Sequence, residues 1–287
     1  MTRAESRPRS RARSRWTGRP LSRRTVLGAA PLAVGTLLLD PARPARALAD
    51  AAPVLAAGYP AQEAAAVREV VTVSHFSLER VRVLVDDRPE LAKAAWDWGF
   101  GDWETALGAA SHTGNHAIAE YLIDHGARPD LFTAAMMGNI AAVRAFVDAT
   151  PGIQGLPGPH GITLRRHAEL GGERARAVLG YLDRLGGADL GPPDLPLALE
   201  QESYVGAYTF GERPEDRFEI TVGSFDKLTI QRGEGSPRTL FHQGDHAFSP
   251  AGAPSARIRF QVEEGAVRAL EIRNPRLVVS ARRTGGG

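Results

Sequence analysis

Aromatic and acidic residues are concentrated in one short stretch of this 287-residue chain. Positions 96–104 read Trp-Asp-Trp-Gly-Phe-Gly-Asp-Trp-Glu, so three of the four Trp residues lie within eight positions, beside three carboxylates. Aromatic side chains bordered by charge are typical of binding hot spots. Alternatively, the rings pack between helices and the acids are solvated or cap a helix expected to begin near Asp102. We take the following as candidate partner-binding residues: Trp96, Asp97, Trp98, Phe100, Asp102 and Trp103.

Histidines form a second group of candidates. His112, His116 and Glu120 have the i, i+4, i+8 spacing that would place three metal ligands on one helix face. Gly114 falls at an expected turn between the two histidines, so one straight helix is not expected and we predict no metal site. His160 lies in a Gly-Pro-His-Gly turn that is rigid enough to present it to a partner. His112 and His160 therefore complete the candidate partner-binding set.

The sequence contains none of the common catalytic motifs. There is no Gly-x-Ser-x-Gly elbow, no Gly-x-x-x-x-Gly-Lys phosphate loop, no His-Glu-x-x-His pair and no Ca²⁺-binding loop. The chain has no Cys, which excludes disulfides, thiolate metal sites and a Cys nucleophile. We therefore expect no enzymatic activity and no cofactor. A hydrolase or metal enzyme that uses Asp97, Asp102, His112 or His160 is the less favoured alternative.

Residues 1–49 have the order of a signal peptide. Eleven Arg against two acidic residues give this segment a net charge of +9, and the apolar residues 25–39 and then Ala47-Leu48-Ala49 follow its Arg-rich start. Ser-Arg-Arg-Thr-Val-Leu at positions 22–27 resembles the twin-arginine signal, which implies that Arg23 and Arg24 direct export of the folded chain. The apolar core would be about 22 Å long as a helix, shorter than the ~30 Å hydrocarbon layer. We expect cleavage after Ala49, and a periplasmic or extracellular protein with no stable membrane anchor.

The rest of the chain carries the opposite charge. Residues 50–287 contain 24 basic and 31 acidic residues, a net charge of −7, although the whole chain has +2. This balance argues against a nucleic-acid or anionic-membrane partner. The acidic excess lies in residues 50–203, where 12 basic and 21 acidic residues give a net charge of −9. An acidic surface there would favour a basic protein partner.

A pattern of small and apolar residues repeats through positions 66–190. The clearest copy contains Leu107, Ala110, Gly114, Leu122, Ile123 and a closing Gly126-Ala127. This unit resembles an ankyrin repeat, although Ala106 and Gly108 replace the Pro and His of that family's pattern. Three weaker copies surround it, and Ser74-His75 matches Ser111-His112 with a shift of 37 positions. Four copies can bury a shared core, so the resemblance implies a helical solenoid.

From Tyr204 onward the apolar residues alternate with polar ones. The runs at 204–210, 218–222, 228–230 and 258–262 are the clearest, and about eight strands fit before Ala281. The order Tyr-x-Gly-x-Tyr, Lys-Leu-x-Ile, His-x-Phe and Ser-Ala-Arg-Ile-Arg-Phe resembles the lipocalin-like β domain of bacterial serine hydrolases of the penicillin-binding type. The Ser-x-x-Lys motif of those hydrolases is missing, so the resemblance implies a fold and no catalysis.

Together these features predict an α+β multidomain protein, with an ankyrin-like helical repeat solenoid followed by a small antiparallel β barrel or sandwich. The expected segments are a signal peptide at 1–49, a linker at 50–65, repeats at 66–190, a Pro-rich linker at 191–203 and a β domain at 204–284. We expect a non-enzymatic exported protein that recognises another extracytoplasmic protein through its repeats. The alternative is an apolar small molecule bound by the β domain. It is weakened because few rings remain to line a cavity once five fill the core: Tyr204, Tyr208, Phe210, Phe218 and Phe260.

Overall fold

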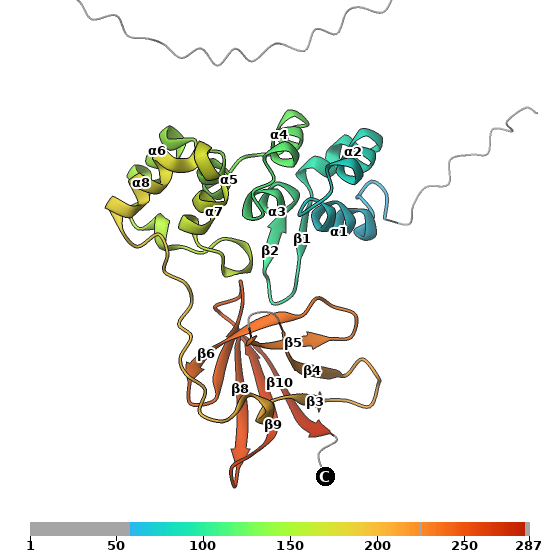
Figure 1. Ribbon diagram of the computed structural model, residues 1–287. Helices are drawn as coiled ribbons and strands as arrows, with labels where there is room; N and C mark the ends of the chain where they lie inside the picture. Colours follow the sequence, from blue (N-terminus) through green and yellow to red (C-terminus); the bar gives the residue numbers. More distant parts are fainter. Residues whose placement is uncertain (1–57, 224–225, 285–287) are drawn as a thin grey trace, which may run out of the picture. The chain divides into compact units, whose positions relative to one another are not determined.

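The computed structural model describes residues 58–223 and 226–284, which belong to one compact unit (Figure 1). The expected signal peptide, with Arg23, Arg24, Ala47 and Ala49, lies outside the described residues, as does the first half of the expected linker at 50–65. None of the described helices combines the length and the apolar content that crossing a bilayer requires.

Eight α-helices are described, and consecutive helices pack in pairs. The pairs are α1 (Ala64–Val73) with α2 (Leu78–Asp87), α3 (Ala106–His112) with α4 (His116–Asp124), α5 (Leu131–Met136) with α6 (Ile140–Ala149), and α7 (Leu164–Leu170) with α8 (Arg176–Leu185). The first helices of neighbouring pairs also contact one another, α1 with α3, α3 with α5 and α5 with α7. The buried residues of α3 include Ala106, Gly108, Ala109 and Ala110, and their small size lets these helices approach closely.

Side-chain caps and glycine turns define the ends of these helices. Five helices begin at a residue whose side chain accepts a hydrogen bond from a backbone N–H of the first turn: Ser77, Thr105, Asp130, Asn139 and Thr163. Gly138, in the turn from α5 to α6, has a φ of +73°, and a Cβ there would lie 2.0 Å from the carbonyl oxygen of Arg174. Only glycine satisfies both conditions at this turn.

A β-hairpin separates the first helix pair from the second. After the short 3₁₀-helix η1 (Pro89–Lys93), β1 (Ala95–Asp97) pairs antiparallel with β2 (Trp103–Thr105), and Trp96 lies opposite Glu104. The expectation of a helix beginning near Asp102 is therefore wrong, because residues 103–105 are extended and Thr105 caps α3. The remaining 3₁₀-helices are η2 (Ile153–Gly155), η3 (Pro159–Gly161), η4 (Gly172–Ala175) and η5 (Gln201–Ser203).

The remaining strands form a closed antiparallel β-barrel of eight strands, which confirms the predicted barrel. They are β3 (Gly206–Thr209), β4 (Arg217–Val222), β5 (Leu228–Arg232), β6 (Arg238–Gly244), β7 (Ala247–Pro250), β8 (Arg257–Glu263), β9 (Ala266–Asn274) and β10 (Leu277–Thr284). Each strand pairs with the next along the chain, and β10 closes the barrel against β3. The expected Pro-rich linker runs along this barrel, where the N–H of Leu195 donates to the carbonyl of His242 at 2.9 Å.

Aromatic rings fill the centre of the barrel. The ring of Tyr204 meets those of Phe248 and Phe260 edge to face, with centroids 5.5 and 5.1 Å apart, and Tyr208 meets Phe260 at 5.6 Å. Phe210 and Phe218, which we expected to fill the core as well, also line a cavity. Rings therefore remain available for a ligand, contrary to the expectation from the low aromatic content.

Candidate functional site

The tip of the β1–β2 hairpin has an unusual backbone. Gly99, Phe100 and Gly101 all have positive φ, at 112°, 59° and 83°. For Phe100 this left-handed conformation costs roughly 1–2 kcal/mol, and the surrounding contacts must compensate. One of them is the Asp97 carboxylate, whose Oδ1 accepts from the N–H of Gly99 at 2.8 Å. The resulting turn places the Phe100 ring against the hydrophobic core of the barrel.

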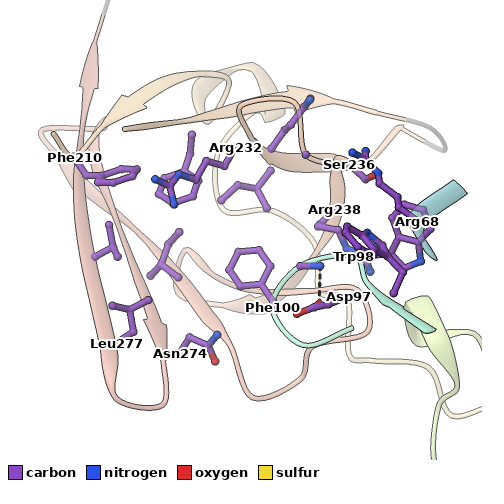
Figure 2. Close-up of a pocket in the computed structure, with 18 residues that line it drawn as sticks. Arg68, Asp97, Trp98, Phe100, Phe210, Arg232, Ser236, Arg238, Asn274 and Leu277 are labelled. Carbon is purple, nitrogen blue, oxygen red and sulfur yellow. Dashed lines mark hydrogen bonds between the residues drawn. The ribbon is translucent and has the colours of Figure 1, made fainter. Parts of the chain in front are cut away.

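Phe100 points into a cavity of about 460 Å³ between the hairpin and the barrel (Figure 2). Its walls are largely apolar. From the hairpin they include Trp96 and Trp98, and from the barrel Phe210, Phe218, Ile230, Ile272, Leu277 and Val279. One side of the Trp-rich segment and one end of the β domain therefore line the same cavity.

Cationic side chains border these apolar walls. The Arg232 guanidinium lies 5.0 Å from the centre of the Phe210 ring, in a cation–π arrangement, and its Nε donates to the carbonyl of Glu215 at 3.0 Å. Arg68 of α1 contributes a second guanidinium at the cavity lining. The acidic lining residue Asp97 is already bonded within its own turn. The cavity thus combines apolar walls with positively charged side chains at its border.

The other side of the hairpin buries two carboxylates. Because side chains alternate along a strand, Trp103 is 63% exposed while Asp102 and Glu104, on either side of it, are almost fully buried. Glu104 Oε2 accepts a hydrogen bond from the Trp98 indole at 2.8 Å. The nearest polar atom to buried Glu104 Oε1 is His112 Nε2, 2.7 Å away, but the two do not have the geometry of a hydrogen bond. A buried carboxylate oxygen of this kind requires a cation or a donor.

Three histidines direct their Nε2 atoms at the Glu104 carboxylate. His112 Nε2 lies 2.7 Å from Oε1, while the Nε2 atoms of His75 and His160 lie 3.4 and 3.3 Å from Oε2. The Nε2 atoms of His75 and His112 are 3.1 Å apart. Four ligand atoms, one from each residue, lie within 4.8 Å of one another. We call these four residues, His75, Glu104, His112 and His160, the histidine–glutamate cluster.

A second carboxylate holds His160 from outside the cluster. Asp102 Oδ2 lies 2.7 Å from His160 Nδ1, and Asp102 Oδ1 accepts from the His160 backbone N–H at 3.0 Å. These bonds hold His160 in a left-handed conformation, with a φ of 60°. Asp102 also forms an ion pair with Arg238 of β6, which donates to the carbonyl of Ala251 at 2.8 Å. Asp102 is therefore shared between the cluster and the barrel.

The charges of these groups change their pKa values. Burial alone would raise the pKa of Glu104, but the neighbouring imidazoles of His112 and His160 outweigh it and hold that pKa below its ordinary value. Burial would lower the pKa of His160, but Asp102 and Glu104 raise it to about 9. For His75, burial prevails and lowers the pKa. His75 and His160 therefore differ in how readily they carry a proton.

The other histidines singled out in the sequence lie elsewhere. His116 Nε2 lies 3.2 Å from the carbonyl of Gly171, and Glu120 pairs with Arg174, so the spacing of His112, His116 and Glu120 does not form a common site. Fully buried His167 donates from Nδ1 to the carbonyl of Thr163 at 2.8 Å. Burial lowers its pKa to about 4, assisted by the charge of His112 and opposed by this hydrogen bond and by Asp130 and Glu104.

The structure divides the candidate partner-binding residues into three groups. The first lines the cavity and comprises Trp96, Asp97, Trp98 and Phe100. The second forms or supports the histidine–glutamate cluster and comprises Asp102, His112 and His160. Trp103 stands apart and faces solvent.

Sequence reasoning did not assign site roles to His75, Glu104 and Arg238. The available signal for His75 was its repeat shift of 37 positions from His112, because equivalent positions in stacked helix pairs lie side by side. The signal for Glu104 was its two-residue separation from Asp102, which places both carboxylates on one face of a strand. For Arg238 the sequence offers no comparable signal.

Comparisons with known proteins leave the family of this chain open. No protein-family model matches the sequence, and no curated protein matches it. A crystal structure described as SurE is similar at 20% sequence identity with a TM-score of 0.25, over 41% of this chain and 28% of that chain. The matched region thus spans less than a third of that protein, and a similarity of this degree carries no argument about fold or function.

Proposed function

We propose that this chain is a binding protein for a small amphiphile, with an apolar body and an anionic group, held in the cavity between the hairpin and the barrel. The observation that carries the proposal is the cavity of about 460 Å³, whose apolar walls are bordered by arginines. Ligand sites are concave, mostly apolar and supplied with a few polar groups, and they commonly measure roughly 300–1,000 Å³. No catalytic step is part of this proposal.

The chemistry of the cavity selects the class of ligand. Phe100, Phe210 and Phe218 present ring faces and edges that suit an alkyl chain or a planar ring. Arg68 and Arg232 favour a carboxylate or sulfonate over a neutral head group. Arg238 also lines the cavity, but its charge is already compensated by Asp102. Arg232 Nη2 lies 3.5 Å from Asp216 Oδ1, an oxygen that Arg213 contacts more closely, at 2.7 Å, so the charge of Arg232 is compensated only in part. An anion would therefore bind at the side of the cavity that contains Arg68 or Arg232.

The export and repeat hypotheses are part of the proposal. We infer that residues 66–190 are an ankyrin-like array, supported by the four helix pairs and by Gly114 and Gly138 at matching turns with φ values of 71° and 73°. We also infer export by the twin-arginine route to a periplasmic or extracellular location, which is supported by the sequence pattern of residues 1–49 alone. The lipocalin-like assignment of the β domain is a further inference, supported by its closed barrel.

Recognition of another extracytoplasmic protein through the repeats is a second candidate function for this chain. Trp103 favours it, because this large aromatic side chain is 63% exposed on a hairpin next to acidic repeats. Tryptophans at such positions are typical anchors of protein interfaces. A basic partner remains the expected kind, given the net charge of −9 in residues 50–203.

Calorimetric titration with dodecanoate, and with 1-dodecanol as the neutral comparison, tests the amphiphile proposal. We expect dodecanoate to bind at one site and more tightly than the alcohol. Leu277→Glu places a negative charge at the cavity lining and should weaken dodecanoate binding about tenfold or more, equivalent to about 1.4 kcal/mol. Leu156→Glu is the matched control, since Leu156 is similarly exposed, at 60% against 59%, and does not line the cavity. Absence of binding, or equal weakening in the two variants, would refute the proposal.

A further inference from the structure

In the histidine–glutamate cluster, the hydrogen bonds of His75 place one acceptor atom against another. Carbonyl oxygens only accept hydrogen bonds, so the contacts of His75 Nδ1 with the carbonyls of Val71 and Thr72, at 3.1 and 2.9 Å, place a proton on Nδ1. In the neutral ring the Nε2 lone pair of His75 then faces the Glu104 carboxylate, with no hydrogen atom between them. Such a contact is repulsive unless a cation lies in the gap.

His160 is held from the other side by the carboxylate of Asp102. Its Nδ1 lies 2.7 Å from an oxygen of Asp102, a carboxylate that only accepts, so the proton again belongs on Nδ1. Its Nε2 is thereby directed at Glu104 Oε2. A metal-binding histidine usually donates its other ring N–H to a carboxylate or a backbone carbonyl, which fixes the tautomer and the ring orientation. His75 shows the carbonyl form of this support, and His160 shows the carboxylate form.

The spacing of the ligand atoms fits one small ion. With bonds of roughly 2.0–2.1 Å, a tetrahedral zinc ion separates its ligand atoms by about 3.3 Å. The contacts between His75 and His112 (3.1 Å), His75 and Glu104 (3.4 Å), and His160 and Glu104 (3.3 Å) are close to that value. The contact between His112 and Glu104 is shorter, at 2.7 Å. Glu104 supplies a negative charge to the ligand set, and its buried Oε1 makes no contact with hydrogen-bond geometry among the described residues, although His112 Nε2 is close to it.

We propose that His75, Glu104, His112 and His160 bind a single divalent transition-metal ion, for which zinc is the best match. Three imidazoles and one carboxylate suit zinc and its first-row neighbours, whereas Mg²⁺ and Ca²⁺ prefer oxygen ligands alone. His75 follows the end of α1, His112 is the last residue of α3, and His160 lies in η3. The ion would therefore join three separate segments of the helical region to the hairpin.

An ion can reach this site from solvent. His75 and His160 are each 22% exposed at the side chain, while His112 and Glu104 are 8% and 0% exposed. The two more exposed histidines line an open hollow together with Trp98 and Arg238. The site thus has a buried half that fixes its geometry and an accessible half through which metal can enter.

This inference is independent of the amphiphile proposal, because the metal ligands and the apolar walls are different residues. The two sites meet at Trp98, which donates to Glu104 and lines the cavity. The metal-binding proposal can therefore hold when the test of the amphiphile proposal fails, and the reverse also applies.

The test is metal binding by the full chain after EDTA treatment and removal of the chelator. We expect one equivalent of Zn²⁺ by elemental analysis and by titration against a chromophoric chelator. One equivalent of Co²⁺ should give the intense visible absorption of a four-coordinate ion. His75→Asn, which alters a partly exposed side chain, should weaken Zn²⁺ binding by more than about 100-fold, and Asp102→Asn by about 10–100-fold, the range for outer-sphere partners.

His125→Asn is the matched control. His125 donates from Nδ1 to the carbonyl of Tyr121 at 2.8 Å, as His75 does to carbonyls of the helix that precedes it, but His125 lies outside the cluster. Circular dichroism of each variant establishes that it is folded before the titration is interpreted. Less than half an equivalent of bound zinc in the unmodified chain would overturn the proposal, as would equal losses of affinity in His75→Asn and His125→Asn.

Discussion

The buried ion pair between Asp102 and Arg238 makes a strong prediction about stability. Their side chains are only 2% and 8% exposed, and Arg238 Nε has no hydrogen-bond partner among the described residues. Asp102→Asn keeps the side-chain shape but leaves the guanidinium without its counter-charge and turns an amide group towards donors of His160. Removing one partner of a buried pair costs about 3–5 kcal/mol, because the other charge stays buried. We expect the free energy of unfolding to fall by this amount.

Urea unfolding in EDTA, followed by tryptophan fluorescence and circular dichroism, measures this cost without any contribution from metal. Adding Arg238→Met to Asp102→Asn should restore part of the stability, since the uncompensated charge is then gone. Asp245→Asn is the control for loss of a surface pair, because Asp245 and its partner Arg259 are 81% and 53% exposed, and we expect little change. If Asp102→Asn unfolds at the same urea concentration as the unmodified chain, or if Arg238→Met recovers nothing, the assigned role of the pair is wrong.

Three further predictions concern packing, protonation and the connection between the two sites. Gly138→Ala should lower the free energy of unfolding by about 2–5 kcal/mol, because of the left-handed φ and the collision with the carbonyl of Arg174. Gly126→Ala, at a φ of +90° with open space around it, should lower it by only about 1–2 kcal/mol, and equal urea midpoints for the two variants would contradict this. Burial lowers the pKa of His167 from 6.5 in the unfolded chain to about 4 in the folded chain, so the unfolded chain binds the proton first as the pH falls. Up to about 3 kcal/mol of the free energy of unfolding is therefore present above pH 6.5 and is lost between pH 6.5 and pH 4. His167→Phe should flatten that part of the stability profile, and an unchanged slope would count against the shift. If zinc fixes Trp98 through Glu104, saturating zinc should tighten dodecanoate binding, and by linkage dodecanoate should tighten zinc binding by the same factor; calorimetry in both orders checks this reciprocity.

The sequence was most informative where the periodicity is regular. Alternating apolar residues from Tyr204 onward predicted about eight strands, and the barrel has eight. Glycines such as Gly114 and Gly138 marked turns between paired helices, because each position requires a positive φ. The β1–β2 hairpin was missed, since its strands have only three residues each and the turn between them contains two glycines. A period cannot be recognised in so short a segment.

The candidate site was predictable only in part. The Trp-rich segment drew attention to Trp98, Phe100 and Asp102, and the structure places all three at the site. The histidine–glutamate cluster depends on contacts between segments up to 85 positions apart, such as those of His75 and His160. Linear spacing does not report such distances, because they depend on how helix pairs stack and on where a loop returns. Of the regularly spaced residues 112, 116 and 120, which were not expected to form a metal site, only His112 belongs to the cluster.

Closure of the barrel through β3 and β10 affects how the chain folds during its synthesis. The hydroxyls of Thr209 and Thr284 lie 3.1 Å apart, although 75 positions separate them. While translation proceeds, every strand from β4 onward can pair with the one before it, but the outer edge of β3 has no neighbour until residues 277–284 leave the ribosome. An unpaired edge can recruit strands from other nascent chains. The interval before the last strand emerges is therefore when aggregation competes most strongly with folding, and a chain that stalls before Leu277 would keep that edge exposed.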